Sequence, residues 1–485
     1  MCQPTPTAAI FDVPRPPAQT LTFLVRDGED DMLLNPFKRR PRPEQGIPMM
    51  AGAFPVLGHL PAIVRDLPGL LHHGEKTYGD HFWLDFGPAG HFVTSTHPDV
   101  FALLRNKDAS SALIEEMATD MLGGSVVAQD GVTHRHARDA IKPTFLPKGL
   151  TQTAIGETFA PLIQQRIQQW CALGEISILR ESGDLMLTLI FRLLGIPPRD
   201  LPQWHHQYRE LIRLLIAPPI NLPGTPLRRG RAARDWIDGQ LREYIRHARA
   251  HPDEPGLFCA LVTSFDQNEQ HLPDATLIAN LRLLVLAGHD TTASTMAWII
   301  VELARRPDVW ALLCEEAERQ GQIPTRYTDL PQYPVAEAVF RETTRLHPPT
   351  TLLPRRAVQD LDIAGRRIQA GTNLCIPLLH LSHSSRLHEK PDEFRLERWL
   401  NKTESIKSID ALQFGTGPHV CIGYHLAWLE LMQFSVALAL TLRRAGQRPQ
   451  LLNDPDKGTH YYPTAHPSMG IRVAFSKEAG RSRTE

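Results

Sequence analysis

The chain has 485 residues, and its 52 Lys and Arg residues against 53 Asp and Glu residues give a formal net charge of -1 at pH 7. Binding to phosphate backbones needs a basic excess, so we expect no nucleic acid partner. Hydrophobic residues form 42% and charged residues 22% of the chain, a mixture typical of globular proteins. No window of about 18 residues is apolar and free of charge, so we expect no transmembrane anchor.

The N-terminal segment, residues 1–45, is rich in proline and ends in the basic stretch 38–42. Its only apolar run, 21–25, is too short for the core of a signal peptide. We therefore expect a loosely ordered extension, with a solvated tail as its ordinary role and weak contact with anionic lipid as the alternative. Residues 46–485 are expected to form one domain.

Helical periodicity dominates the rest of the chain. Apolar residues recur at spacings of three and four in the segments 97–106, 151–170, 184–195, 229–250, 275–306, 308–320, 334–346 and 422–444. Short runs at 82–94, 351–376 and 460–475 are expected to be extended, with Gly and Pro between them. The pattern predicts a mainly α domain with small β-sheets, of the α+β class.

The long helix at 275–306 has an unusual centre, Ala287-Gly288-His289-Asp290-Thr291-Thr292. Glycine lowers helix stability, and threonine hydroxyls compete for backbone carbonyls. Taken alone, the sequence is explained by a kinked core helix. A buried helix has little reason to place Gly, Asp and two Thr together at its middle.

The helix at 334–346 carries Glu342 and Arg345, which share one helix face at i, i+3 and can pair. Taken alone, this is a surface ion pair worth little stability. The helix ends at His347-Pro348, because the residue before a proline disfavours helical geometry.

The six cysteines are scattered and form no C-x-x-C pair, so a zinc ribbon or thioredoxin-like site lacks its signature. Cys421 stands apart because it lies just before the predicted helix 422–444. The positive end of a helix and its free N–H groups favour thiolate over thiol, and a thiolate is a good ligand for iron. A cysteine taken alone is more often a small buried hydrophobe.

Four residues around this cysteine carry a family resemblance. Phe414, Gly417, Cys421 and Gly423 match every fixed position of the F-x-x-G-x-x-x-C-x-G signature of the cytochrome P-450 family. The E-x-x-R helix and the A-G-x-D/E-T sequence of that family resemble 342–345 and 287–291. The resemblance covers roughly residues 46–475. It implies a single mainly helical domain holding one haem b, with Cys421 as the axial thiolate.

The resemblance also assigns charged residues. Arg398 would complete a buried network with Glu342 and Arg345, shaping the proximal side of the haem site. Leu396 and Trp399 stand where the family usually has proline and phenylalanine.

Cations for the haem carboxylates are implied by the same resemblance. His134 and Arg138 resemble the family's G-x-x-H-x-x-x-R segment, and Arg355 resembles the arginine of its R-x-x-x-x-D segment. His419 stands where arginine is frequent, which predicts that haem retention depends on pH.

The implied reaction is insertion of one atom of dioxygen into a lipophilic substrate, a terpenoid, sterol, fatty acid or polyketide. Thr291 would steady iron-bound oxygen and Asp290 would relay protons, while His289 is expected to face outward. Electrons would come from NAD(P)H through a ferredoxin- or flavodoxin-type donor and its reductase, and the enzyme would be cytoplasmic. Segments 110–125, 203–228, 350–354 and 461–470 are expected over the distal haem face.

Three other functions remain open. One is a peroxygenase that takes its oxygen from hydrogen peroxide, and another is a haem-thiolate enzyme that catalyses isomerisation or dehydration. Asp290 and Thr291 argue against both, because neither reaction needs an acid–threonine pair. The third is a haem-binding sensor without catalysis.

Overall fold

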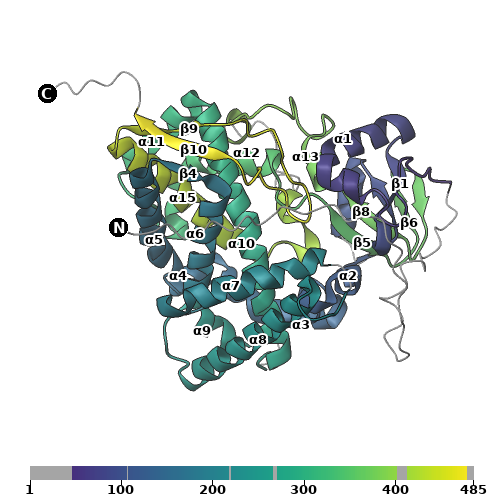
Figure 1. The fold of residues 1–485 in the computed structure, drawn as a ribbon, viewed down its shortest axis with the longest axis horizontal. Coiled ribbons are helices and arrows are strands. Elements are labelled where there is room, and N and C mark those ends of the chain that lie inside the picture. Colours follow the sequence, from purple (N-terminus) through teal and green to yellow (C-terminus); the bar gives the residue numbers. More distant parts are fainter. Residues whose placement is uncertain (1–45, 106–107, 218–219, 266–269, 401–411, 478–485) are drawn as a thin grey trace. The chain divides into compact units, whose positions relative to one another are not determined.

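The computed structural model describes residues 46–105, 108–217, 220–265, 270–400 and 412–477 (Figure 1). The extension at 1–45, with its basic stretch, lies outside the described residues, so the division at residue 45 stays a prediction. The described helices are α1 Leu60–Tyr78, α2 Ala112–Leu122, α3 Gly131–Phe145, α4 Pro147–Gln152, α5 Ile155–Leu173, α6 Ile178–Leu193, α7 Leu201–Ile212, α8 Pro226–Ala250, α9 Leu257–Val262, α10 Asp274–Arg305, α11 Pro307–Gln320, α12 Pro334–Leu346, α13 Leu378–Ser382, α14 Glu397–Leu400 and α15 Tyr424–Arg444.

The strands are short and form three small sheets. They are β1 His81–Asp85, β2 His91–Ser95, β3 Ala109–Ser110, β4 Glu175–Ser177, β5 Leu353–Ala357, β6 Leu361–Ile363, β7 Arg366–Ile368, β8 Asn373–Ile376, β9 Gln447–Leu451 and β10 Arg472–Lys477. The sheet orders are β1-β2-β8-β5-β3, β4-β10-β9 and β6-β7. The expected mainly α class with small sheets is confirmed.

Helix α10 runs through the helical core and contacts α6, α8, α12 and α15. All residues from Thr292 to Leu303 are buried, so this half of the helix has no face for water. A helix that is apolar on all sides belongs in a core. The polar turn Gly288–Thr291 lies just before this buried half and is more open to solvent.

Helix α15 packs against α5 and α11 on the other side of the core. Among the described residues it is the one helix long and apolar enough to cross a membrane, and most of it is buried inside the protein. Core helices of folded proteins have the same composition, because all of their faces meet other side chains.

The largest sheet joins segments that are far apart in the chain. Strands β1 and β2 form an antiparallel hairpin with His81 opposite Ser95. Strand β8 pairs parallel with β2 and antiparallel with β5, and so brings residues 353–357 beside the N-terminal hairpin. In Figure 1 this sheet lies beside α1, at one end of the helical core.

Two predicted elements differ in the structure. Within the segment 97–106, residues Pro98–Leu104 form a 3-10 helix and not the expected α-helix. The 3-10 helix is the more tightly wound form and is common in short helical segments that connect other elements. In 460–475, strand pairing is limited to a bridge between His460 and His466 and to β10, which begins at Arg472. Prolines at 463 and 467 lack the N–H that a continuous strand needs.

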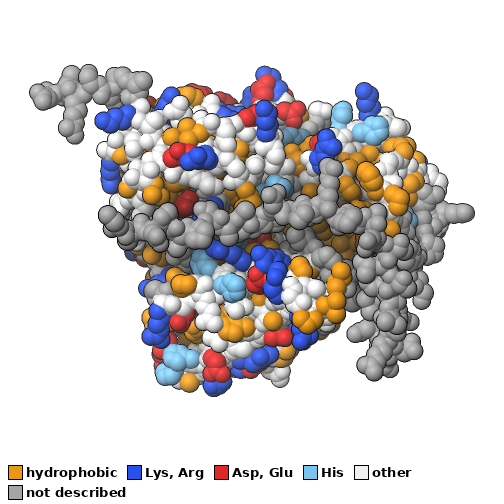
Figure 2. Space-filling view, in the orientation of Figure 1, with side chains coloured by type: hydrophobic (Ala, Val, Ile, Leu, Met, Phe, Trp, Pro, Cys, Tyr) orange, Lys and Arg blue, Asp and Glu red, His pale blue; other side chains and the backbone are white. Residues whose placement is uncertain are grey.

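Charged side chains of both signs are interspersed over the face shown in Figure 2. This agrees with the balanced composition and shows no broad basic surface on that face.

Candidate active site

The loop before α15 has a backbone that requires glycine. Gly417 has φ 68°, and a Cβ there would lie 2.3 Å from the Leu104 carbonyl oxygen. The Cys421 N–H donates to the Phe414 carbonyl at 2.8 Å, which closes the loop. Gly423 is the N-cap of α15, which begins at Tyr424. The loop therefore holds Cys421 two residues before that N-terminal cap.

Solvent reaches the Cys421 side chain, although protein packs closely around it. The surrounding protein raises the pKa of the thiol, while the Gly423 N–H and the Arg138 charge act in the opposite direction. The start of the helix acts on the sulfur in the predicted direction, through the Gly423 N–H, but the loss of hydration around the sulfur is the larger effect in the protein chain. A cation at the sulfur, as in iron ligation, reverses this balance.

Two buried side chains, one from α3 and one from β5, lack complete hydrogen-bond or ion-pair partners among the described residues. The Nε2 atom of His134 is buried and, among the described residues, has no hydrogen-bond partner. Arg355 is 5% exposed, donates to the Pro354 carbonyl at 2.8 Å, and forms no ion pair with a described carboxylate. Burial lowers the pKa of His134 to about 4 and that of Arg355 to about 10. Arg138 donates to the Val420 carbonyl at 2.6 Å, next to the cysteine.

His419 contacts a carboxylate of the same chain, Asp130, which the sequence did not reveal. Its Nε2 lies 3.1 Å from Asp130 Oδ1, and its ring lies 4.2 Å from the His134 ring, measured between centroids. Asp130 also accepts hydrogen bonds from the Ser110 hydroxyl and the Ser111 N–H. Burial acts to raise the pKa of Asp130, but these hydrogen bonds lower it well below its ordinary value. The pH dependence of haem retention stays a prediction.

These observations fit a haem. An accessible sulfur lies near Arg138, whose charge acts on it, and Arg355 is a buried cation whose counter-charge, Asp130, acts on it without a direct ion pair. Haem carboxylates would supply the missing anions, and haem iron would supply the cation that the thiolate needs.

The Glu342 network is compact and buried. Arg345 donates from Nε and Nη2 to the two carboxylate oxygens of Glu342, each at 2.9 Å. Arg398 Nε lies 3.3 Å from Glu342 Oε1, and the Trp399 indole N–H donates to Oε2 at 2.9 Å. The Arg395 N–H also donates to Oε1. Burial alone would raise the pKa of Glu342, but these donors hold it below its ordinary value. The structure thus brings the three predicted residues together and adds Trp399.

Asp290 lies against His289 in the polar turn of α10. The His289 Nδ1 atom is 2.5 Å from Asp290 Oδ1, and Nε2 is 3.2 Å from the Gly183 carbonyl oxygen. A carbonyl cannot donate, so Nε2 carries a proton. The expectation that His289 faces outward is wrong, because its ring packs onto α6 and the Tyr208 ring.

Thr291 donates its hydroxyl to the Ala287 carbonyl at 2.5 Å. Its oxygen lone pairs are left available to accept a hydrogen bond. Among the hydrogen bonds of the described residues, none joins the side chains of Thr291 and Asp290. The two predicted catalytic residues are neighbours in the sequence, but their side chains have separate partners.

Glu430 of α15, which continues the resemblance to the family beyond the cysteine loop but was given no role from the sequence, is a buried carboxyl group. Thr292 of α10 donates to Glu430 Oε1 at 3.1 Å. Burial raises the pKa of Glu430 to about 8, although the Thr292 hydrogen bond lowers it somewhat. A glutamate at an otherwise apolar helix position was the available signal.

The comparisons with known proteins agree with this site. Residues 48–445 match the family model described as Cytochrome P450. The chain is 64% identical over 446 residues to the Cytochrome P450 BJ-4 homolog of Sinorhizobium fredii, covering 92% of this chain and 100% of that protein. It is 27% identical over 399 residues to the cyclooctat-9-en-7-ol 5-monooxygenase of Streptomyces melanosporofaciens, covering 78% of this chain and 85% of that protein.

Among solved structures, the retinoic-acid-bound cyanobacterial CYP120A1 superposes with a TM-score of 0.77 at 21% identity, covering 89% of this chain and 100% of that one. The fold and the cysteine loop define a haem-thiolate monooxygenase. The chain belongs to the cytochrome P-450 family.

Proposed function

We propose that this cytochrome P-450 holds haem b with Cys421 as its axial ligand and inserts one atom of dioxygen into a lipophilic substrate. The cysteine loop carries the proposal, because it presents an accessible sulfur near Arg138 and just before α15. When bound, the haem supplies oxygen activation. Phe414, Gly417 and Gly423 shape the loop that holds the sulfur.

The haem carboxylates would be held by His134, Arg138 and Arg355. His134 offers a buried ring nitrogen, and Arg355 offers a buried guanidinium. His419 would act with them through its contacts with Asp130 and the His134 ring. The Glu342–Arg345–Arg398 network would keep the segment around residue 395 fixed beneath the site.

Proton supply is assigned to α10. The contact between His289 Nδ1 and Asp290 Oδ1 lies one residue from Thr291, whose hydroxyl oxygen can accept a hydrogen bond. Asp290 would relay protons towards the bound oxygen, and Thr291 would hold that oxygen in position. This arrangement favours a dioxygen-dependent reaction over a peroxide-driven one.

A lipophilic substrate is supported by segments that converge on α10. The Ser294 hydroxyl donates to the Ala465 carbonyl at 2.6 Å, which ties the loop 461–469 to this helix. The Val126 N–H donates to the Asn280 side chain at 2.9 Å, which ties the segment after α2 to the same helix. Within α2, Leu113 and Met121 are buried apolar residues.

Among lipophilic classes we favour a terpenoid. The relative from Streptomyces melanosporofaciens is named for oxidation of cyclooctat-9-en-7-ol. The segment 222–226 resembles one in members of the family that act on isoprenoids and sterols. Sterols, fatty acids and polyketides are the competing classes. We place the enzyme in the cytoplasm, with NAD(P)H as electron source through a ferredoxin- or flavodoxin-type donor and its reductase.

The first experiment compares reduced, carbon-monoxide-bound spectra of wild type, Cys421→Ala and Cys171→Ala. Cys171 is a half-buried cysteine outside the loop. We expect the strongly red-shifted Soret band of thiolate ligation in wild type and Cys171→Ala, and its loss in Cys421→Ala. A histidine-type band in wild type would overturn the assignment of the ligand.

The second experiment screens terpenoids, sterols, fatty acids and polyketides by the spin-state shift of the ferric enzyme. Compounds that shift the spectrum are then incubated with a surrogate ferredoxin, its reductase, NADPH and ¹⁸O₂. Incorporation of one labelled oxygen atom into a terpenoid supports the proposal. Turnover with hydrogen peroxide alone, at the same rate and without reductase, would contradict the dioxygen route.

A further inference from the structure

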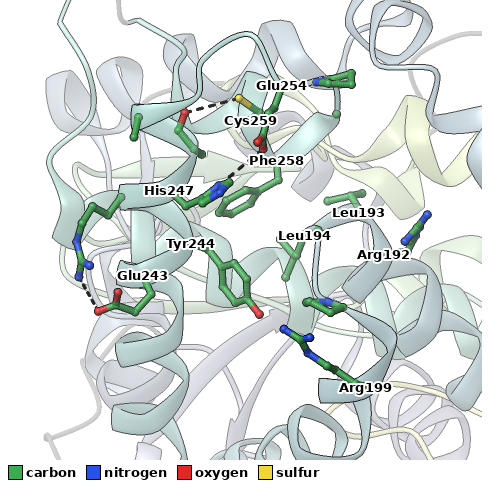
Figure 3. Close-up of a pocket in the computed structure, with 17 residues that line it drawn as sticks. Arg192, Leu193, Leu194, Arg199, Glu243, Tyr244, His247, Glu254, Phe258 and Cys259 are labelled. Carbon is green, nitrogen blue, oxygen red and sulfur yellow. Dashed lines mark hydrogen bonds and ion pairs between the residues drawn. The ribbon is translucent and has the colours of Figure 1, made fainter.

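A surface pocket of about 790 Å³ lies between the end of α6, the end of α8 and the start of α9. Figure 3 shows its lining, which includes Tyr244, His247, Glu254 and Phe258. None of its lining residues comes from the cysteine loop. The pocket is therefore separate from the site described above and needs its own explanation.

The rim of this pocket carries a group of metal-ligating side chains. Among the described residues, His247, His251 and Glu254 form the one group of three His, Cys, Asp or Glu side chains whose ligand atoms all lie within 4.8 Å of one another. All three are exposed. Figure 2 shows pale-blue histidine side chains gathered at the lower left, over the α8–α9 region.

The local backbone explains why the three meet. His247 lies in the last turn of α8, and His251 is the residue that caps its C-terminus. The Glu254 N–H donates to the His251 carbonyl at 3.1 Å, so the chain turns back immediately after the helix. Free carbonyl groups at the end of a long helix favour a cation there.

The hydrogen bonds leave ligand atoms available. His251 Nδ1 lies 3.0 Å from the His247 carbonyl oxygen, so Nδ1–H is the donor and the unprotonated Nε2 of the neutral ring is free. A ring nitrogen fixed by a backbone carbonyl is the usual support for a histidine that binds metal through its other nitrogen. The His247 and His251 rings stack with centroids 4.4 Å apart, where two protonated rings would repel each other.

The geometry of His247 and Glu254 is close to that of a ligand pair. His247 Nδ1 lies 3.7 Å from Glu254 Oε2, and the two side chains point toward each other in Figure 3. Tetrahedral zinc with bonds of about 2.0–2.1 Å places its ligand atoms roughly 3.3 Å apart. The side chains are 60% and 53% exposed, so small rotamer changes can bring them to that spacing.

We propose that His247, His251 and Glu254 bind one divalent transition-metal ion of the Zn²⁺ class, with water completing its coordination. Two imidazoles and one carboxylate form a donor set that suits Zn²⁺ and disfavours Ca²⁺ and Mg²⁺, which take oxygen ligands. The ion would link the end of α8 to the turn before α9. It would thereby fix one rim of the pocket, independently of the haem.

The competing explanation is a surface ion pair between protonated His247 and Glu254, with no metal. The two explanations differ in what Zn²⁺ does to the purified haem-loaded protein. After treatment with EDTA and its removal, the protein is titrated calorimetrically with Zn²⁺, and bound zinc is counted by mass spectrometry after dialysis. Mg²⁺ and Ca²⁺ serve as reference cations.

We expect one zinc ion per chain in the wild type and a rise in melting temperature with Zn²⁺ that Mg²⁺ and Ca²⁺ do not produce. His247→Gln and His251→Gln should each weaken zinc binding at least tenfold, and Glu254→Gln should weaken it less. Two controls should bind like wild type: Glu243→Gln, exposed on α8, and His206→Gln, exposed on α7.

Either of two results would overturn the proposal: no zinc bound by wild type, or the same zinc binding in His247→Gln as in wild type. The reduced carbon-monoxide spectrum, recorded on the same samples, tests Cys421 separately. A failure of the haem assignment and a failure of the zinc site are therefore distinguishable.

Discussion

Two groups of buried charge in this protein differ in how much of their charge the protein itself compensates. Glu342 meets donors from Arg345, Arg398 and Trp399. Arg355 is nearly as buried, yet it pairs with no described carboxylate, and its main contact is with a neighbouring carbonyl. Removing one partner of a buried ion pair is strongly destabilising, and a buried charge without a direct partner costs stability. The charge of Glu342 is matched by direct partners within the fold, whereas Arg355 is balanced only through space, by Asp130.

The largest effect on stability is expected for the Glu342→Ala variant, which tests whether the buried network holds the fold together. It leaves two buried arginines without their carboxylate, and we expect the free energy of unfolding to fall by about 3–5 kcal/mol. Chemical unfolding followed by tryptophan fluorescence measures the loss. The control, Glu393→Ala, removes only an exposed ion pair with Lys390 and should cost under about 1 kcal/mol. Equal effects of the two variants would show that the buried network is not structural.

A second variant, Glu430→Gln, tests whether the buried Glu430 carboxyl group is protonated at pH 7. The raised pKa of Glu430, about 8, means that the folded protein binds one proton more than the unfolded chain above the ordinary carboxyl pKa. Unfolding then releases this proton, so stability falls as pH rises, by roughly 2–3 kcal/mol between pH 5 and 7. Glu430→Gln cannot titrate and should remove this slope. Unfolding curves at several pH values measure it, and an unchanged slope would contradict the buried neutral carboxyl group.

Arg355→Met should not lower the stability of the haem-free chain, in contrast to Glu342→Ala. Haem should dissociate at least tenfold faster, a loss of about 1.4 kcal/mol in binding, because a carboxylate loses its cation. The haem-free chain should be as stable as wild type or more stable, because a buried charge without a direct partner is gone. Haem transfer to apomyoglobin measures the first effect. Arg356→Met is the matched control, since Arg356 already pairs with Glu116.

The smallest effect is expected for Asp130→Asn. The pKa of Asp130 lies below its ordinary value, so its stabilisation is present above the ordinary carboxyl pKa and is lost as pH falls below it. Asp130 is part-exposed and asparagine keeps one acceptor oxygen, so the loss at pH 7 should be about 1 kcal/mol. Thermal unfolding should show the full difference at pH 7 and a steadily smaller one as the pH falls below the ordinary carboxyl pKa. A difference that stays the same size from pH 7 down to the acid limit of folding would contradict the charge-based explanation.

The sequence predicted the parts of this protein that depend on local spacing. The i, i+3 relation brought Glu342 and Arg345 together, and the helical periodicity located α10 and α15 within a few residues. The fold class and family followed from the same patterns. The glycines around Cys421 helped to identify the cysteine loop from the sequence. The structure shows why one of them is needed, because any side chain at Gly417 would meet the Leu104 backbone.

Contacts across long sequence separations were not predictable in the same way. Asp130 and His419 are 289 residues apart, and nothing in either neighbourhood marks them as partners. His289 was assigned outward because helix periodicity gives a direction but not the element packed there, which is α6. The net effect on Cys421 was also missed, because a helix dipole is visible in sequence and the packing around a sulfur is not.

The hydrogen bond from Ser294 to the loop 461–469 has a consequence for protein engineering. Ser294 lies one helical turn after Asp290 on the same helix. Libraries that vary this loop to change the accepted substrate would therefore also shift the turn that holds Asp290, the residue proposed to relay protons. Selectivity and the fraction of reducing equivalents that end in product should change together, unless Ser294 and the Ala465 backbone are kept as a fixed pair.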